Sequence, residues 1–498
     1  MILADDPHDQ ALLAHCRPRG WPRLSPAGRY TLVVYTLVVL GGGPAGLVAA
    51  FGAAALGAKV ALVERDLLGG DCLVTGCVPS KALLRSAHAA EAARRAGPLG
   101  LSAAVEVDFP AVMERLRRVR AELAPHDSAE RLRRAGVDVF FGAARFVGPD
   151  RVSVEGQELR FHRCLIATGA RSVLPPIPGL AEAGALGHEA LFTLRERPAR
   201  LLVLGGGVIG CEMAQAFARL GSRVTLVEAG ARLLSREDPD ASALLAARLT
   251  EDGVELCLGA TVTRAERQGE ERRLHLAGGR TLAGDALLVA VGRAPNLDLD
   301  LERAGVEVGP EGLRVDDHLR TTNRRVFGAG DVLGPGSTTH AADHQARLVL
   351  RNALFPFGRA RRSRLVLPRV TYTQPEVAAV GLSAAEAARD PRLQVFTVAV
   401  GETDRARTDG EAEGFGRVVV DRRGRLFGAL IVAEQAGELL APLTFAMTQG
   451  LGLAELARTV HAYPTRSELV FKLASAWSRG RLTPSLSGWT RRWFSLWR

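Results

Sequence analysis

The chain has 498 residues, of which 47% are hydrophobic and 24% charged, and its formal net charge is +10. These values describe an ordinary globular protein of about two to four domains that buries a large core. Nearly all of the positive charge is arginine, scattered singly and in pairs, because lysine occurs only at positions 59, 81 and 472. Long basic runs are absent, so we expect no nucleic-acid partner.

Six cysteines, at positions 16, 72, 77, 164, 211 and 257, are too few for a secreted disulfide framework in a chain of this length. We therefore expect a cytoplasmic protein. The uncharged stretch from Thr31 to Ala58 has the length of a membrane span. Its glycines follow a nucleotide-binding pattern, and we prefer that interpretation.

The first residues give no sign of a folded unit. Residues 1–29 are polar and contain four prolines, which predicts an extended arm. A short repeat follows, in which Tyr30–Val34 is succeeded by the copy Tyr35–Val39. Only the second copy adjoins a glycine run, so we expect it to form the first core strand.

That strand leads into a glycine-rich turn typical of dinucleotide binding. Gly41 allows a tight turn, Gly43 lets a pyrophosphate approach the backbone, and Gly46 lets helix and strand pack closely. An alanine-rich helix follows, whose N-terminus would face the phosphates. The next strand ends in Glu64, which can bond a ribose hydroxyl.

The same unit occurs a second time, with its glycines at Gly205, Gly207 and Gly210 and its acid at Glu228. The interval from first glycine to acid is identical in the two copies, 41 to 64 and 205 to 228. Two such sites suggest one bound flavin and one exchanging nicotinamide. An acid in the place of Glu228 favours NADH over NADPH, because it repels a 2′-phosphate; Arg232 could soften this preference.

The stretch from Gly69 to Ala82 contains the paired cysteines Cys72 and Cys77, followed by Pro79 and a helical apolar pattern. Cys77 would then lie at a helix entry, where free N–H groups favour a thiolate. Two buried structural thiols, or half of a zinc site, are the alternatives. Zinc needs two further ligands, and no second paired-Cys or Cys/His cluster exists in the sequence, so we favour redox chemistry and expect no metal.

The run Gly69-Gly70-Asp71-Cys72, continued by Cys77-Val78-Pro79-Ser80-Lys81, resembles the redox-active disulfide signature of the flavin-dependent pyridine nucleotide-disulfide oxidoreductases. That family includes lipoamide dehydrogenase, glutathione reductase and mercuric reductase. The resemblance covers about residue 35 to 475. It implies an α/β fold with two Rossmann-like domains, one for FAD and one for NAD(P), and a C-terminal α+β domain that forms a homodimer.

The resemblance also implies domain boundaries. We assign an FAD-binding domain to 30–175 and 295–365, an NAD(P)-binding domain to 176–294, and a dimerisation domain to 366–478. A basic, Trp-rich tail over 479–498 completes the chain. Its tryptophans at 489, 493 and 497 form one helical stripe. We favour packing of this tail within its own dimer over attachment to a membrane surface.

Further cofactor contacts follow from the resemblance alone. Thr168 and Gly169 lie in a run similar to the family's Ala-Thr-Gly junction, where the chain leaves the flavin domain. Gly292 belongs to a run similar to the Gly-Arg-x-Pro-Asn return. Asp331 lies in a run that resembles the second flavin motif and would bond a ribityl hydroxyl.

The same resemblance implies the roles of the thiols and their neighbours. Cys77 would be the thiol on the flavin side, and Cys72 the outer thiol that meets the substrate. Glu212, near the start of the second unit's helix, matches an acid that pairs with Lys81 beside the flavin.

One motif departs from the family pattern. Disulfide-reducing relatives carry His-Pro-Thr-x-x-Glu, whose histidine is a proton carrier for the partner subunit's outer thiol. Here the motif ends in Glu468 and Tyr463 takes the place of the histidine, while His461 lies two residues earlier. A phenol with a reference pKa of about 10 is a poor base at pH 7. Whether Tyr463 or His461 handles protons stays open.

The sequence thus predicts an NAD(P)H oxidoreductase that passes electrons through FAD and a Cys72–Cys77 disulfide to a small-molecule acceptor. It is similar to mercuric reductases, but these hand over the metal through a cysteine pair, and no cysteine follows Cys257 here. The alternative is an NADH-dependent quinone or dye reductase, or a redox-sensing flavoprotein, whose disulfide does not turn over.

Overall fold

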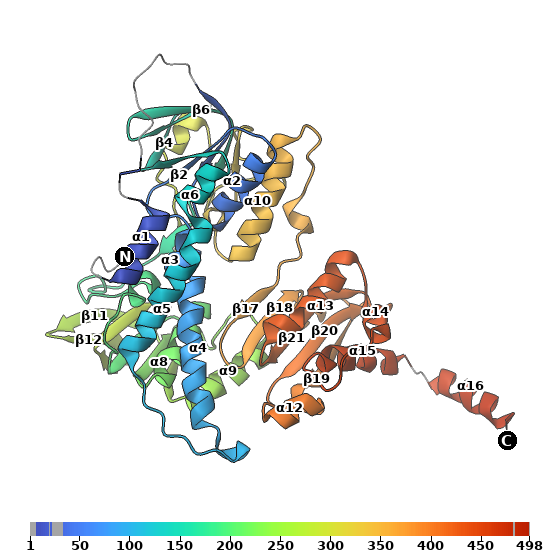
Figure 1. The fold of residues 1–498 in the computed structure, drawn as a ribbon. Helices are drawn as coiled ribbons and strands as arrows, with labels where there is room; N and C mark the ends of the chain where they lie inside the picture. Colours follow the sequence, from blue (N-terminus) through green and yellow to red (C-terminus); the bar gives the residue numbers. More distant parts are fainter. Residues whose placement is uncertain (1–5, 19, 22–32, 482–483, 498) are drawn as a thin grey trace. The chain divides into compact units, whose positions relative to one another are not determined.

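The computed structural model describes residues 6–18, 20–21, 33–481 and 484–497. Two compact units divide the chain (Figure 1). The first unit comprises Met1–Arg94, Ala104–Ala229 and Gly253–Leu365, and the second comprises Arg95–Ala103, Gly230–Asp252 and Val366–Arg498.

A seven-stranded sheet forms the core of the first nucleotide-binding region, in the order β3-β2-β1-β6-β5-β4 with β16 paired to β6. The pairs that join β3, β2, β1, β6 and β16 are parallel, whereas β4 and β5 form an antiparallel extension. Leu40 pairs with Ile166, which also pairs with Gly328, so three parallel strands end level. The strands are β1 (Val34–Leu40), β2 (Val60–Glu64), β3 (Val137–Phe141), β4 (Ala144–Gly148), β5 (Arg151–Val154), β6 (Gln157–Ile166) and β16 (Val326–Gly328).

The central strands of this sheet are buried along almost their whole length, because helices cover the sheet. Leu37, Val39 and Leu62 pack with the apolar faces of α2 and α10 in one core cluster. A second core cluster contains Val38 and Leu40 together with buried residues of the antiparallel strands β4 and β5. The helices are α1 (Pro7–Cys16), α2 (Pro44–Ala55), α3 (Gly70–Val74), α4 (Cys77–Arg94), α5 (Phe109–Leu123), α6 (Ala129–Arg134) and α10 (Thr339–Leu354).

A second parallel sheet, in the order β10-β9-β8-β14, belongs to the same unit. Leu204 pairs with both Val227 and Val289, so these strands also end level. The region contains β8 (Arg200–Leu204), α8 (Val208–Arg219), β9 (Arg223–Glu228), β10 (Val254–Leu258), β14 (Ala286–Val289), the short helix α7 (His188–Leu191), an antiparallel sheet of β11 (Val262–Gln268), β12 (Glu271–Leu276) and β13 (Thr281–Gly284), and the two-stranded pair β7 (Ala170–Ser172) and β15 (Arg293–Pro295).

The second unit is built on a five-stranded antiparallel sheet in the order β17-β18-β21-β20-β19. Its buried residues form one core cluster with α13, α14 and α15. The elements are α9 (Pro239–Glu251), β17 (Arg369–Thr371), β18 (Glu376–Gly381), α11 (Ala384–Ala387), β19 (Leu393–Ala399), α12 (Asp404–Asp409), β20 (Phe415–Asp421), β21 (Leu426–Ala433), α13 (Ala436–Gln449), α14 (Leu453–Arg458), α15 (Glu468–Gly480) and α16 (Pro484–Ser495).

The prediction of an extended arm over 1–29 is wrong for its first part, because Pro7–Cys16 forms α1. Asp6 caps this helix by accepting hydrogen bonds from the backbone N–H groups of His8 and Asp9. Pro7 occupies the first helical turn, where a missing N–H costs nothing. A proline there starts a helix rather than interrupting one.

The second copy of the Tyr-Thr-Leu-Val-Val repeat forms most of β1, as expected. Most of the first copy, Tyr30–Leu32, lies outside the described residues. The uncharged stretch beyond it is occupied by β1 and α2. Within the described ranges, no helix is both long enough and apolar enough to cross a bilayer.

The segment around α9 groups with the second unit rather than with the nucleotide-binding region that precedes it in sequence. Ion pairs hold it there, one of them between Arg248 and Glu413. Arg417 Nη1 lies 2.8 Å from Asp238 Oδ2 and Arg417 Nη2 lies 2.7 Å from Asp240 Oδ2. Arg369 Nε lies 2.5 Å from Glu237 Oε1.

A buried ion pair fixes α1 to α5 and supplies a test of the fold. Arg120 Nη2 lies 2.5 Å from Asp9 Oδ1, and each side chain is 1% exposed. Replacing Asp9 by alanine leaves the guanidinium buried without its charge partner. We expect a loss of about 3–5 kcal/mol in unfolding free energy. The measurement is the midpoint of urea unfolding. Glu130→Ala, which breaks an exposed pair with Arg133, is the control and should cost at most about 1 kcal/mol. Equal midpoints for the two variants would contradict the prediction.

Candidate redox and nucleotide-binding site

The level ends of β1, β6 and β16 bring the first cofactor residues together at one edge of the sheet. Gly41 has φ +104°, and a Cβ there would lie 2.3 Å from the carbonyl oxygen of Ala167, so only glycine fits. Thr168 Oγ1 donates to the carbonyl of Asn296 at 2.7 Å, and Asn296 Nδ2 donates back to Thr168 O at 2.9 Å. The backbone N–H of Asn296 donates to Gly169 O. The Ala-Thr-Gly junction and the Pro-Asn return therefore hold one another in place.

The start of α2 has the donors that a pyrophosphate requires. Gly43 caps the helix without any side-chain hydrogen bond. The first N–H groups of α2 therefore have no side-chain acceptor at the cap and can face an anion. A Cβ on Gly46 would lie 1.8 Å from Gly41 O, so the helix packs directly on the turn. Glu64 Oε2 accepts from Gly42 N at 2.6 Å. These residues fit a bound dinucleotide.

The second glycine turn, between β8 and α8, repeats this geometry contact by contact. Gly205 has φ +112°, and a Cβ on Gly210 would again lie 1.8 Å from the carbonyl oxygen of the turn glycine. Gly207 caps α8 without a side-chain hydrogen bond. Glu228 Oε2 accepts from Gly206 N at 2.6 Å. The donor set therefore fits a second dinucleotide.

The two cysteines lie on consecutive helices: Cys72 in α3, and Cys77 as the first residue of α4. Both are free thiols in this structure. Cys77 Sγ lies 3.2 Å from Thr339 Oγ1, at the start of α10. Among the residues with described positions, no group of three His, Cys, Asp or Glu side chains could hold a metal ion.

The surroundings make the two thiols different acids. The hydrogen bond from Cys72 is the largest influence on Cys77, and with Thr339 and the charge of Lys81 it outweighs burial and lowers the pKa of Cys77 to about 6. The same hydrogen bond, with burial, raises the pKa of Cys72. Cys77 is therefore the thiolate of the reduced pair at neutral pH.

Lys81 and Glu212 form the ion pair that the resemblance implied. Lys81 Nζ on α4 lies 2.8 Å from Glu212 Oε2 on α8, and the glutamate side chain is only 4% exposed. The thiol-bearing helix is thus connected to the helix that opens the second nucleotide site.

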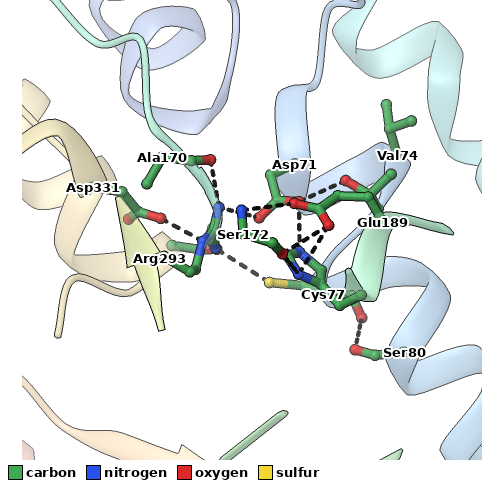
Figure 2. A network of polar contacts seen from close by, with 12 residues as sticks. Asp71, Val74, Cys77, Ser80, Ala170, Ser172, Glu189, Arg293 and Asp331 are labelled. Carbon is green, nitrogen blue, oxygen red and sulfur yellow. Dashed lines mark hydrogen bonds and ion pairs between the residues drawn. The ribbon is translucent and has the colours of Figure 1, made fainter. Parts of the chain in front are cut away.

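A polar network, whose contacts the sequence did not predict, lies near Cys77 (Figure 2). At its centre is Arg293, whose Nη2 lies 2.7 Å from Asp71 Oδ2 and whose Nη1 lies 3.3 Å from Asp331 Oδ2. Burial acts to raise the pKa of Asp71, but the hydrogen bond from His188 and the charge of Arg293 lower it overall. Burial raises the pKa of Asp331, against the opposing effect of Arg293. Arg293 thus joins the residue before Cys72 to the proposed ribityl ligand.

A buried histidine extends this network. His188 Nε2 lies 3.3 Å from Asp71 Oδ1, and its Nδ1 lies 2.8 Å from Ser172 Oγ. Ser172 Oγ donates to Glu189 Oε2 at 2.7 Å. A cavity of about 150 Å³ adjoins these groups. It is lined by Ser172, His188, Val208, Ile209, Val289, Ala290, Gly292 and Arg293.

Two of these residues lie in recognisable sequence motifs. Arg293 lies in the Gly-Arg-x-Pro-Asn run, and Asp71 adjoins Cys72. Nothing around His188 distinguishes it from a structural histidine. Its neighbours in the network are up to 117 residues away in the chain.

The motif that departs from the family pattern lies in the second unit. Tyr463 is 71% exposed, and its hydroxyl donates to Asp404 Oδ2 at 2.8 Å. That carboxylate raises the pKa of Tyr463. Glu468 begins α15 and pairs with Lys472 at 3.2 Å. The ring of His461 packs against Phe471, with 5.8 Å between ring centroids.

The Thr339 contact can be tested through the acidity of Cys77. Thr339→Val removes a hydrogen bond that stabilises the thiolate, so the pKa of Cys77 should rise. In the reduced protein, the pH midpoint of Cys77 alkylation by iodoacetamide should lie near 6. This midpoint should rise by about one pH unit in the Thr339→Val variant. Ser80→Ala is the control, because Ser80 Oγ donates to the Cys77 carbonyl and not to its sulfur. An unmoved midpoint in Thr339→Val would show that the threonine does not tune the thiol.

Comparison with known proteins places this geometry in a family. The family described as pyridine nucleotide-disulphide oxidoreductase matches residues 35–346, and its dimerisation domain matches residues 367–474. The mercuric reductase of Bacillus cereus is 36% identical over 454 residues, which cover 89% of this chain and 71% of that protein. The dihydrolipoyl dehydrogenase of Bacillus subtilis is 32% identical over 449 residues, covering 87% and 95%.

Solved structures agree with this assignment. The HOCl-induced flavoprotein disulfide reductase RclA from Escherichia coli has a TM-score of 0.79 and 30% identity, covering 89% of this chain and 99% of that one. LpdA from Mycobacterium tuberculosis has a TM-score of 0.82 and 29% identity, with the same coverage. The chain therefore belongs to the pyridine nucleotide-disulphide oxidoreductase family and carries that family's dimerisation domain.

Proposed function

We propose that this protein oxidises NADH and delivers the two electrons through the Cys72/Cys77 pair to a small acceptor. The family binds FAD, which when bound supplies the two-electron link between nicotinamide and thiols. The observation that carries the proposal is Cys77, the first residue of α4, with its pKa lowered to about 6. A thiolate at neutral pH can attack a mixed disulfide between Cys72 and an acceptor, which forms the Cys72–Cys77 bond and releases the acceptor thiolate.

The residues that would hold FAD are those at the edge of the first sheet. The N–H groups at the start of α2 would receive the pyrophosphate, and Glu64 would take the ribose. Asp331 would bond the ribityl chain, oriented by its ion pair with Arg293. The second glycine turn, at the start of α8, offers the equivalent donors to the nicotinamide dinucleotide.

A disulfide acceptor would be reduced in two thiol–disulfide exchange steps. The outer thiol, Cys72, loses its proton and attacks one acceptor sulfur, which forms a mixed disulfide and releases one thiolate. The Cys77 thiolate then attacks Cys72 Sγ, which re-forms the Cys72–Cys77 bond and releases the second thiolate. Each released thiolate takes up one proton. NADH supplies the two electrons that reduce the pair again.

The reductant is proposed to be NADH because Glu228 ends β9, where an acid bonds the ribose 2′-hydroxyl and repels a 2′-phosphate. We do not expect Arg232 to shift the cofactor preference from NADH toward NADPH. Its guanidinium donates to three backbone carbonyls in its own loop, those of Leu234, Ser235 and Glu237.

A second candidate function is supported by Tyr463. Its phenol replaces the imidazole that protonates released thiolates in disulfide-reducing relatives, and Asp404 raises its pKa further. Reduction of quinones or of soft metal ions depends less on a proton carrier at that position. An acceptor of the quinone type, with a thiol pair that does not turn over, is therefore the alternative to thiol-dependent reduction.

A screen of NADH oxidation with disulfides, quinones and Hg(II) as acceptors, run on wild type and Cys72→Ala, tests the proposal. We expect the wild type to purify yellow with bound FAD and to gain long-wavelength absorbance on two-electron reduction, from the Cys77 thiolate beside the flavin. Turnover with its best acceptor should be lost in Cys72→Ala. Cys257→Ala, on β10, is the control and should keep its activity. Full activity of Cys72→Ala with quinones would support the second candidate instead, and a protein without flavin would contradict both.

The role of Tyr463 is tested by placing histidine there. Tyr463→His should raise reduction of lipoamide or glutathione disulfide at pH 7 by about tenfold or more, because an imidazole titrates near neutrality. Tyr463→Phe removes the same hydroxyl without adding a base and is the matched control. Steady-state rates between pH 6 and 9 provide the measurement. Wild-type rates already typical of disulfide reductases would show that another group carries the proton.

A further inference from the structure

The helix α16 (Pro484–Ser495) presents an apolar face with no described cover. Trp489 and Trp493 lie one turn apart and stack, with 6.0 Å between ring centroids and 14° between planes. Their side chains are 62% and 48% exposed. Phe494 and Trp497 are exposed as well. Most globular proteins cover aromatic groups of this size, so this exposed face is expected to be an interaction site.

The charge of this region has one sign. From Leu469 to Arg498 the sequence contains no aspartate or glutamate. On α16 itself, Arg491 and Arg492 are exposed. The basic residues of the whole region are at positions 472, 479, 481, 491, 492 and 498. Its surroundings thus complement a negatively charged surface.

The match to the family's dimerisation domain does not extend to this helix. That match ends at residue 474, whereas α16 begins at Pro484. Two copies of α16 facing one another would also bring like charges together. Both points argue against the packing of the tail within its own dimer that the sequence favoured.

Tryptophan on one side and arginine on the flank is the composition of a helix that lies in a membrane interface. The helix has 12 residues, about 18 Å of length, which is too short to span a bilayer. We infer that α16 attaches this enzyme to the surface of a bilayer containing anionic lipid. The tryptophan rings enter the headgroup region while the arginines pair with lipid phosphates. This attachment goes beyond the redox function and does not depend on it.

The experiment uses the full-length holoenzyme and phosphatidylcholine vesicles with and without phosphatidylglycerol. We expect flotation with the anionic vesicles, a blue shift of tryptophan emission, and release by added salt. Trp489→Ser combined with Trp493→Ser should lower the partition coefficient at least about tenfold, and so should Arg491→Glu combined with Arg492→Glu. NADH oxidation in solution should be unchanged in both, because these residues are not part of the redox site.

A matched charge reversal separates the helix from the general charge of the protein. Arg422→Glu with Arg423→Glu changes an exposed arginine pair in the turn between β20 and β21 and should leave vesicle binding unchanged. Failure of the wild type to float with anionic vesicles would overturn the inference. A fall in dimer mass for the tryptophan variant, measured by sedimentation without vesicles, would do the same, because it would assign the face to a second copy of the chain.

Discussion

The register of one parallel sheet determines where most of the candidate cofactor residues lie. β1, β6 and β16 come from distant parts of the chain, yet Leu40, Ile166 and Gly328 end level. Because the carboxyl ends of parallel strands meet at one edge, the glycine turn, the Ala-Thr-Gly junction and Asp331 converge there. A slip of one residue in β16 would reverse the faces of its side chains and remove Asp331 from this edge.

The same constraint places the thiols. The chain leaves β2 at Glu64 and reaches α3 within a few residues, so Cys72 and Cys77 lie close to the nucleotide turn. Thr339 arrives from the segment after β16 and contacts Cys77 at 3.2 Å. The acidity of Cys77 therefore depends on a residue that only the completed sheet can deliver.

Local patterns were readable from the sequence, and contacts between distant segments were not. The glycines and their acids could be predicted because a βαβ unit fixes their spacing within some twenty residues. Lys81 and Glu212 could be paired only through a family resemblance. The contacts of Arg293 and His188 depend on the tertiary path, and no spacing rule reports them. α1 was missed because Pro7 and a polar composition concealed a cap and a buried ion pair.

The negative charge of Asp71 works against the thiolate, since it raises the pKa of both cysteines. Arg293 and His188 both contact that carboxylate. The positive charge of Lys81 lowers the pKa of Cys77. The acidity of Cys77 thus reflects a balance of fixed charges as well as its helix position.

Arg293 has one guanidinium and serves two carboxylates, Asp71 and Asp331, which are 260 residues apart. Neither acid can be lost without leaving the arginine's charge directed wholly at the other. Shortening or neutralising the arginine would leave two partly buried carboxylates without this shared counter-charge. The three positions are therefore not independent: a substitution at any one of them changes the charge balance at the other two.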